Sequence, residues 1–171
     1  RSSLLIPVEP VNPFHIHSVV SCLGHNLSFK GLFGPPRRLV TDVTRRLCRA
    51  VNANKPTGKV KFILMNATGN RNRDLDEKIS FGQKCVIGLL RLLLPPHAVN
   101  ENAADYLRAR TGQNDESIEW AVVRPDTLTD EDAISAFEIH PSPIRSAIFD
   151  AGTSSRANVA CFMADLIEDD D

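Results

Sequence analysis

The chain has 171 residues and a formal net charge of -1, with 42% hydrophobic and 24% charged residues. This size and composition are typical of one globular domain with a buried core, and the near-neutral charge argues against nucleic acid as a partner. No apolar run approaches the roughly 20 residues that cross a bilayer, so no membrane span is expected.

Four cysteines (Cys22, Cys48, Cys85 and Cys161) are scattered without a CxxC pair. This spacing favours a reducing compartment, the cytoplasm or the interior of an organelle, over a disulfide framework. His15 and His17 would lie on one side of a strand, but no further ligands accompany them, so no metal site is predicted. Cys22 is expected to be a small buried hydrophobic residue at a strand end.

Residues 1–17 are expected to form an irregular N-terminal segment, because Pro7, Pro10 and Pro13 interrupt its apolar run. The chain starts at Arg1 and its first residues lack the apolar core of a signal peptide, so further sequence is expected upstream. The globular domain is predicted over 18–167. Residues 168–171 are expected to be an acidic tail.

Three buried strands are predicted, and each ends in small or polar residues. The strands with their following turns are Ser18–Leu23 with Gly24–Asn26, Val60–Met65 with Asn66–Asn70, and Ile118–Val123 with Arg124–Thr129. Pro125 helps to end the third strand, because proline cannot donate to a sheet ladder. In an open α/β sheet, ligands bind outside the carboxyl ends of the strands, so these turns are the place to look for a site.

Helical patterns separate the strands. The predicted helices are 36–54, opening at Pro36; 81–93, after a capping box of Ser80 and Gln83; 101–111, capped by Asn100 and ended by Gly112; and 155–167. We expect surface loop over 70–79, short helix or loop over 129–138, and a last strand at Ile144–Phe149. Strands that alternate with helices predict an α/β fold with a mainly parallel sheet.

The order of the segments VVSCLGHN, VKFILMNATGN, ENAADYLR and IEWAVVRPDTLTD resembles the atypical short-chain dehydrogenase/reductase family, and more narrowly its NmrA-like NAD(P)-binding proteins. Asn158-Val159-Ala160 is similar to the family's Asp-Val-Ala segment, with Asn158 in place of the acid. The resemblance covers about 18–167, the carboxyl-terminal portion of such a domain. It implies a Rossmann-like sheet without the first βαβ unit and its glycine-rich turn, an oxidoreductase-like function, and NADP or NAD as the cofactor.

The resemblance also implies that residues at the three strand ends contact the ribose and nicotinamide of that cofactor. These residues are Leu23, Gly24, Asn66, Ala67, Thr68, Arg124 and Pro125. They also have the chemistry that turns prefer, so a purely structural role is the alternative. Gly24, Gly31 and Gly34 do not have the spacing of a phosphate-binding turn. We therefore expect the pyrophosphate site upstream, and this chain alone need not hold the cofactor.

No catalytic residue is identified by the sequence. Tyr106 and Arg110 have the spacing of the family's Tyr-x-x-x-Lys pair, with arginine in place of the lysine, but Tyr106 is expected to pack on its helix instead. The substrate is not predicted.

A second hypothesis makes the protein a non-catalytic Rossmann-like scaffold or regulatory subunit. Without a preceding strand, Val19–Leu23 would leave an apolar sheet edge uncovered, and such an edge pairs with another strand. Residues 4–8, another chain or a second copy of this one are the candidates.

Overall fold

The computed structural model describes residues 16–24, 35, 38–68, 80–93 and 95–169. A parallel sheet of three strands lies at the centre: β1 (Ser18–Ser21), β2 (Val60–Met65) and β3 (Ile118–Val123), in that order. Val19 lies opposite Phe62, and Phe62 lies opposite Trp120. All three predicted strands are confirmed, although the first ends at Ser21 rather than Leu23. The α/β class with a parallel sheet and flanking helices is confirmed with them.

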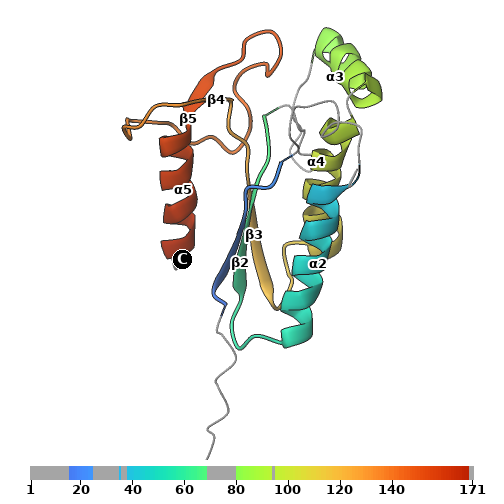
Figure 1. Ribbon diagram of the computed structural model, residues 1–171, viewed down its shortest axis with the longest axis vertical. Helices are drawn as coiled ribbons and strands as arrows, with labels where there is room; N and C mark the ends of the chain where they lie inside the picture. The colour runs from blue at the N-terminus through green and yellow to red at the C-terminus, as the bar shows by residue number, and fades with distance from the viewer. Residues whose placement is uncertain (1–15, 25–34, 36–37, 69–79, 94, 170–171) are drawn as a thin grey trace, which may run out of the picture.

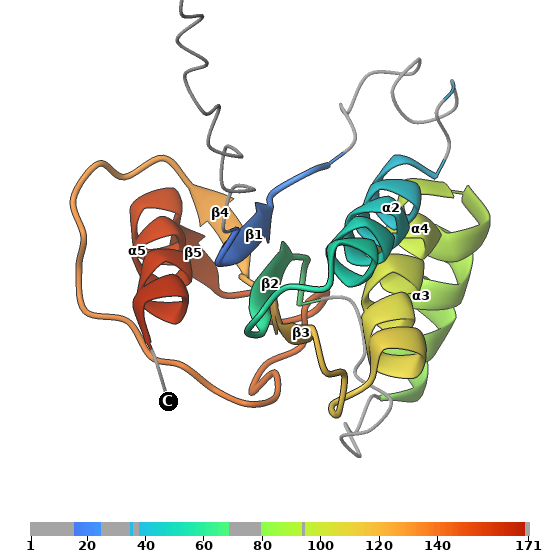
Figure 2. The same cartoon turned by 90° about the horizontal axis from the view of Figure 1, so that it is seen from below.

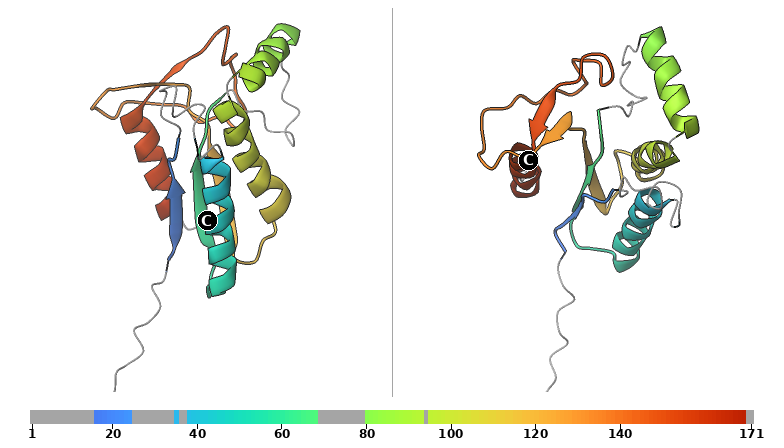
Figure 3. Two further views of the ribbon diagram at one scale, coloured as in Figure 1. Left: turned by 45° about the vertical axis from the view of Figure 1, so that its right-hand side comes forward. Right: turned by 45° about the horizontal axis from the view of Figure 1, so that its top comes forward.

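Helices cover both faces of this sheet (Figures 1 and 2). α2 (Leu39–Asn54) and α4 (Pro95–Tyr106) lie on one face, and α5 (Arg156–Glu168) lies on the other. α3 (Phe81–Leu93) lies beside α4 at the end of the molecule where the strands terminate (Figure 3). Right-handed crossovers between strands in consecutive order put their connecting helices on one face, which explains the position of α2 and α4.

The core sits on both sides of β2, because successive strand residues point to opposite faces. Phe62 and Leu64 pack in the cluster under α2 and α4, with Cys48 and Leu107 among their neighbours. Ile63 packs with Val123 and Met163 on the α5 side. Burial on both faces explains why the stretch 62–65 of β2 reads as a continuous apolar run rather than an alternating one.

The third predicted helix, 101–111, begins earlier than expected. α4 starts at Pro95 and runs through Asn100, so Asn100 is not its cap. Proline fits the first turn of a helix because its missing N–H would have no partner there. α4 continues into a π-helical turn, η1 (Leu107–Thr111), which ends at Gly112 as predicted. Gly112 has a φ of 71°, and its N–H donates to the Leu107 carbonyl at 2.8 Å.

The prediction of a last strand at Ile144–Phe149 is wrong. The hydroxyl oxygen of Ser146 accepts hydrogen bonds from the N–H groups of Ile148 (3.4 Å) and Phe149 (3.1 Å), which holds this stretch in a turn. The last strand is instead β5 (Thr153–Ser155). It pairs in parallel with β4 (Thr127–Thr129), and the two form a small second sheet.

The ends of the other predicted elements fit the structure where it describes them. α2 ends at Asn54, α3 spans Phe81–Leu93, and α5 begins after Ser155. Residues 130–138 follow β4 as loop, and Glu168 still belongs to α5 rather than to a tail. The predicted loop at 70–79, the helix start at Pro36, the side chain of Gln83, most of the N-terminal segment and the last two residues lie outside the described residues. No helix among the described residues has the length and apolar character to cross a membrane.

Two buried hydroxyl groups among the described residues lack a hydrogen-bond partner, and one belongs to Thr44 on α2. Thr44 is fully buried in the structure. An unpaired buried hydroxyl costs about 1 to 3 kcal/mol, so Thr44→Val should raise the free energy of unfolding by about 1 kcal/mol. Urea denaturation measures this change. The same substitution at the exposed Thr127 should move stability by less than about 0.5 kcal/mol. A loss of stability in Thr44→Val would show that the hydroxyl is satisfied.

Candidate functional site

The carboxyl ends of β2 and β3 are joined by backbone hydrogen bonds beyond the sheet itself. The N–H of Asn66 donates to the Val123 carbonyl at 2.8 Å, and the N–H of Thr68 donates to the Pro125 carbonyl at 3.3 Å. The Asn66 side-chain oxygen accepts from the N–H of Ala67 at 3.0 Å, which fixes the turn. Two of the three predicted strand ends therefore lie side by side.

A cavity of about 650 Å³ opens next to these strand ends. Thr68, Arg124 and Pro125 line it, together with Asp126, residues of the segment 129–145 and the start of α5. Its volume falls within the range of small-molecule sites. The connection from β4 to β5 supplies many of the lining residues. Figure 2 shows this connection curving around α5.

Four of the predicted site residues do not line this cavity. Asn66 and Ala67 belong to the turn that carries Thr68, and their contacts there are backbone-directed. Leu23 and Gly24 follow β1, where Leu23 is 41% exposed. A side-chain carbon placed on Gly24 would meet no atom of the described residues within 4 Å.

The β4–β5 pair brings a carboxylate and a glycine into close contact. The N–H of Thr127 donates to the Gly152 carbonyl at 3.2 Å. A Cβ on Gly152 would lie 2.5 Å from Oδ2 of Asp126, so a larger residue there would displace the carboxylate. Both residues line the cavity. The sequence analysis missed this contact, and the only local signal for it is a glycine directly before Thr153.

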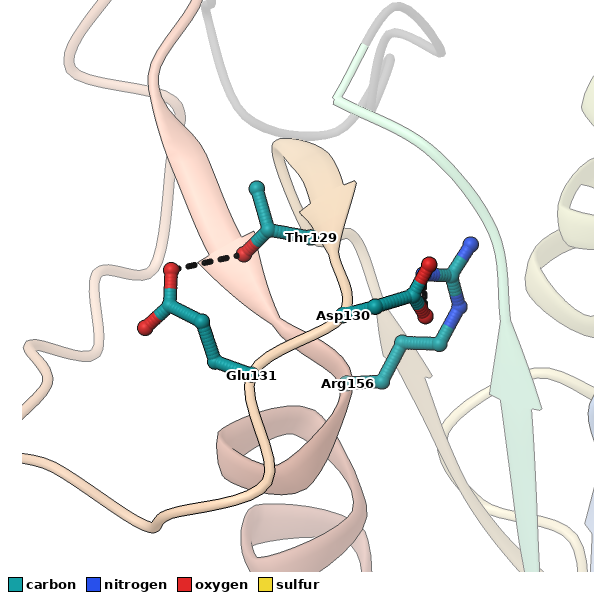
Figure 4. Close-up of polar contacts among 4 residues, drawn as sticks. All are labelled: Thr129, Asp130, Glu131 and Arg156. Atoms are coloured by element: carbon teal, nitrogen blue, oxygen red, sulfur yellow. Dashed lines mark hydrogen bonds and ion pairs between the residues drawn. The ribbon is translucent and has the colours of Figure 1, made fainter.

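The end of β4 is tied to the start of α5 by side-chain contacts (Figure 4). The Thr129 hydroxyl donates to Oε1 of Glu131 at 3.1 Å, and Arg156 forms an ion pair with Asp130. The side chains of Arg156 and Asp130 are 55% and 89% exposed, so solvent screens the pair and its contribution to stability is small. Figure 4 shows both contacts on the connection next to the first turn of α5.

The side chain of Asn158, on α5, forms two hydrogen bonds with Ser135 in the loop that lines the cavity. Its side-chain oxygen accepts from the N–H of Ser135 at 2.9 Å, and its amide nitrogen donates to the Ser135 hydroxyl at 3.0 Å. The N–H of Asn158 donates to the Ser155 hydroxyl at 3.0 Å, which caps the helix. Two residues further along the loop, Phe137 meets Phe162 edge-to-face with ring centroids 6.4 Å apart. The segment 135–137 is therefore held on α5 by polar and aromatic contacts.

Tyr106 lies away from this cavity. It packs against the core on the α2 side, and the Arg45 guanidinium lies 5.7 Å from the centre of its ring. Arg110 is exposed in η1. Neither residue lines the cavity, so the pair with Tyr-x-x-x-Lys spacing does not reach the proposed site.

The burial of one cysteine, Cys22, differs from the expectation. Cys22 is exposed rather than buried, because β1 ends one residue before it. Cys48 lies on the buried face of α2 and is 2% exposed, and burial raises the pKa of its thiol from 9.0 to about 11. Across the described residues, no three or more His, Cys, Asp or Glu side chains gather as a metal site would require. His15, one member of the histidine pair, lies outside the described residues.

The raised pKa of Cys48 predicts a loss of stability in alkali. The unfolded chain releases this thiol proton near pH 9, whereas the folded chain keeps it until about pH 11. Between those values the unfolded state binds fewer protons, so stability falls as pH rises. Two units of pKa correspond to about 2 to 3 kcal/mol. Denaturant unfolding of the wild type and of Cys48→Ala at pH 8 and pH 10.5 measures this fall in the free energy of unfolding. Equal pH slopes in both proteins would contradict the expectation.

Comparison with protein-family models, with curated proteins and with solved structures finds no match to this chain. The functional assignment therefore depends on the chemistry of the site. Among the lining residues, Thr68 carries a hydroxyl group and Arg124 a guanidinium group, both of which can form hydrogen bonds with a polar small molecule. A glycine-rich phosphate turn is not found in the described parts of the chain.

Proposed function

We propose that this chain forms most of a dinucleotide-binding domain of the atypical short-chain dehydrogenase/reductase type, and that NADP or NAD binds at the carboxyl edge of its sheet. One observation carries the proposal. Thr68 and Arg124–Pro125 follow adjacent parallel strands, are held together by hydrogen bonds, and face one cavity of about 650 Å³. Ligands of open α/β sheets bind at this edge.

In this proposal the chain's own residues bind and orient the nicotinamide half of the cofactor. Thr68 offers a hydroxyl donor and acceptor, and Arg124 offers a cation with fixed donor geometry. When bound, the reduced cofactor supplies a hydride to a substrate in the same cavity. The pyrophosphate would be held by a strand, glycine-rich turn and helix from the first βαβ unit, which the proposal assigns to sequence upstream. The reducing compartment expected from the cysteines suits such a protein.

The exposed apolar edge of the sheet supports a second candidate, a non-catalytic scaffold or regulatory subunit. Val20 in β1 is 42% exposed, and Ile16 and Leu23, which flank the strand, are 56% and 41% exposed. Within the described ranges, β1 pairs only with β2, so its outer edge carries backbone groups without a strand partner. The missing unit of a larger domain, another protein or a second copy would each cover this edge.

Titration with NADPH, followed by thermal unfolding, distinguishes the two candidates. Saturable stabilisation of the wild type supports the dinucleotide site and excludes a scaffold without cofactor, since a ligand that binds only the folded state raises its stability. Arg124→Ala should raise the NADPH concentration at the titration midpoint by about tenfold, because the variant loses one charge-assisted hydrogen bond to the cofactor. Arg110→Ala, an exposed arginine outside the cavity, is the control and should leave it unchanged. No stabilisation at millimolar NADPH would refute cofactor binding by this chain.

A further inference from the structure

The connection between β4 and β5 carries an unusual number of exposed apolar side chains. Large apolar residues in this loop are 40% to 64% exposed: Ile134, Phe137, Ile139, Ile144 and Phe149. Loops normally place polar residues at the surface, and clusters of exposed apolar side chains mark binding sites. The described part of the loop therefore has a composition that suits contact with something other than water.

Three of these side chains face the candidate cavity. Phe137, Ile139 and Ile144 line it, and Val159 and Phe162 from α5 complete an apolar wall. At the strand ends the lining includes the polar residues Thr68, Arg124 and Asp126 as well as apolar ones. The apolar group from the loop and α5 therefore shares one cavity with the polar groups where the proposed cofactor binds.

The charges near the apolar wall partly neutralise one another. Glu138 and His140 lie within 3.1 Å of each other, and Arg145 lines the same region. Glu138 and His140 also line the cavity, next to the apolar side chains of the loop. This arrangement gives no strong preference for a charged ligand. A group of apolar side chains beside polar ones can hold an apolar molecule that has one polar end.

We propose that the wall formed by the β4–β5 loop and α5 binds a small, uncharged, apolar molecule, with its polar end directed towards Thr68 and Arg124. This inference deepens the proposed function, because it names the class of substrate that the cavity would admit. The binding step itself does not require the cofactor, so the two claims can fail separately.

The chain supplies a matched pair of residues for the test. Ile139 and Ile134 lie in the same loop and are 62% and 63% exposed, but only Ile139 lines the cavity. Polar substitution at these exposed positions should leave the fold intact. Ile139→Asn and Ile134→Asn therefore remove the same amount of apolar surface, but only Ile139→Asn changes the lining of the cavity. Phe137→Ala is a second variant in the cavity wall.

The probe is N-phenyl-1-naphthylamine, an uncharged aromatic dye whose fluorescence rises in apolar sites. We expect saturable binding to the wild type, weakened about tenfold or more in Ile139→Asn and Phe137→Ala, because each loses an apolar contact in the pocket. Ile134→Asn should bind the dye as the wild type does. Equal weakening in Ile134→Asn and Ile139→Asn would mean that the dye reads general surface hydrophobicity, and it would overturn the proposal. So would the absence of saturable binding.

Parallel titration with NADPH separates this inference from the proposed function. Dye binding with no NADPH stabilisation would support the apolar pocket while the dinucleotide site fails. NADPH stabilisation without dye binding would retain the dinucleotide site and refute the apolar pocket.

Discussion

Replacement of Phe62 by alanine is expected to lower the free energy of unfolding by about 3 to 5 kcal/mol, the largest change among the substitutions considered. Phe62 is fully buried at the middle of the central strand β2. Its side chain packs in the cluster beneath α2 and α4, so its removal leaves a cavity where two helices and the sheet meet. Because most domains are stable by only about 5 to 15 kcal/mol, this single change approaches global unfolding. Urea denaturation followed by far-ultraviolet circular dichroism measures it.

Phe81 provides the matched control. It is the same residue type at the start of α3, but it is 81% exposed. Phe81→Ala should change stability by no more than about 0.5 kcal/mol. If both substitutions cost the same, Phe62 is not in a packed core and the arrangement of α2 and α4 on the sheet is incorrect.

The second large effect is expected at Asn158, which fastens the cavity wall to α5. Asn158→Ala removes both side-chain hydrogen bonds to Ser135 and should cost about 1 to 3 kcal/mol. The loss should be local, because Ser135 belongs to the loop and not to the central sheet. Hydrogen exchange at the Ser135 amide and proteolysis of the loop should both accelerate. The variant should also bind the apolar dye more weakly, since residues 135–137 line the cavity.

Two further variants test the geometry of this contact. Asn158→Asp keeps an oxygen that accepts from the Ser135 N–H, so it should retain more stability than Asn158→Ala. Ser135→Ala removes the hydroxyl and leaves the backbone N–H, so it should cost less than Asn158→Ala and add little to it in the double variant. Full additivity of Asn158→Ala and Ser135→Ala would show that the two side chains do not interact.

The sequence predicted the central sheet because its signal is local. Val60–Met65 is apolar on both faces, and the structure buries both faces. The helices between the strands were recognised from their apolar stripes and end residues, as at Gly112. α4 was predicted to start too late, at residue 101, whereas Pro95 occupies its first turn, where a proline is well tolerated.

The second sheet could not be predicted, because its strands are short and polar. Thr153–Ser155 has no apolar alternation, and it becomes a strand only through its pairing with Thr127–Thr129. The apolar stretch Ile144–Phe149 gave a stronger strand signal, but in the folded chain it is a turn closed by Ser146. The local apolar pattern therefore predicted a strand at the wrong segment, because pairing with β4 determines where the last strand forms.

The proximity of three candidate residues was predictable for the same reason. Thr68, Arg124 and Pro125 meet because the carboxyl ends of parallel strands share one edge of the sheet. The contacts of Asp126 with Gly152 and of Ser135 with Asn158 join residues more than 20 positions apart through the loop. No periodicity or spacing in the sequence encodes such contacts.

The central claim, a dinucleotide site at the carboxyl edge of the sheet, is tested most directly by amide chemical shifts. At 18.9 kDa the chain suits two-dimensional nitrogen–proton spectra of the labelled protein during titration with NADPH. We expect saturable shifts that cluster at the amides of Thr68, Arg124, Asp126 and Thr127, with those of η1 and the carboxyl end of α2 unmoved. Shifts confined to η1 or α2, or no shifts at millimolar NADPH, would contradict the account.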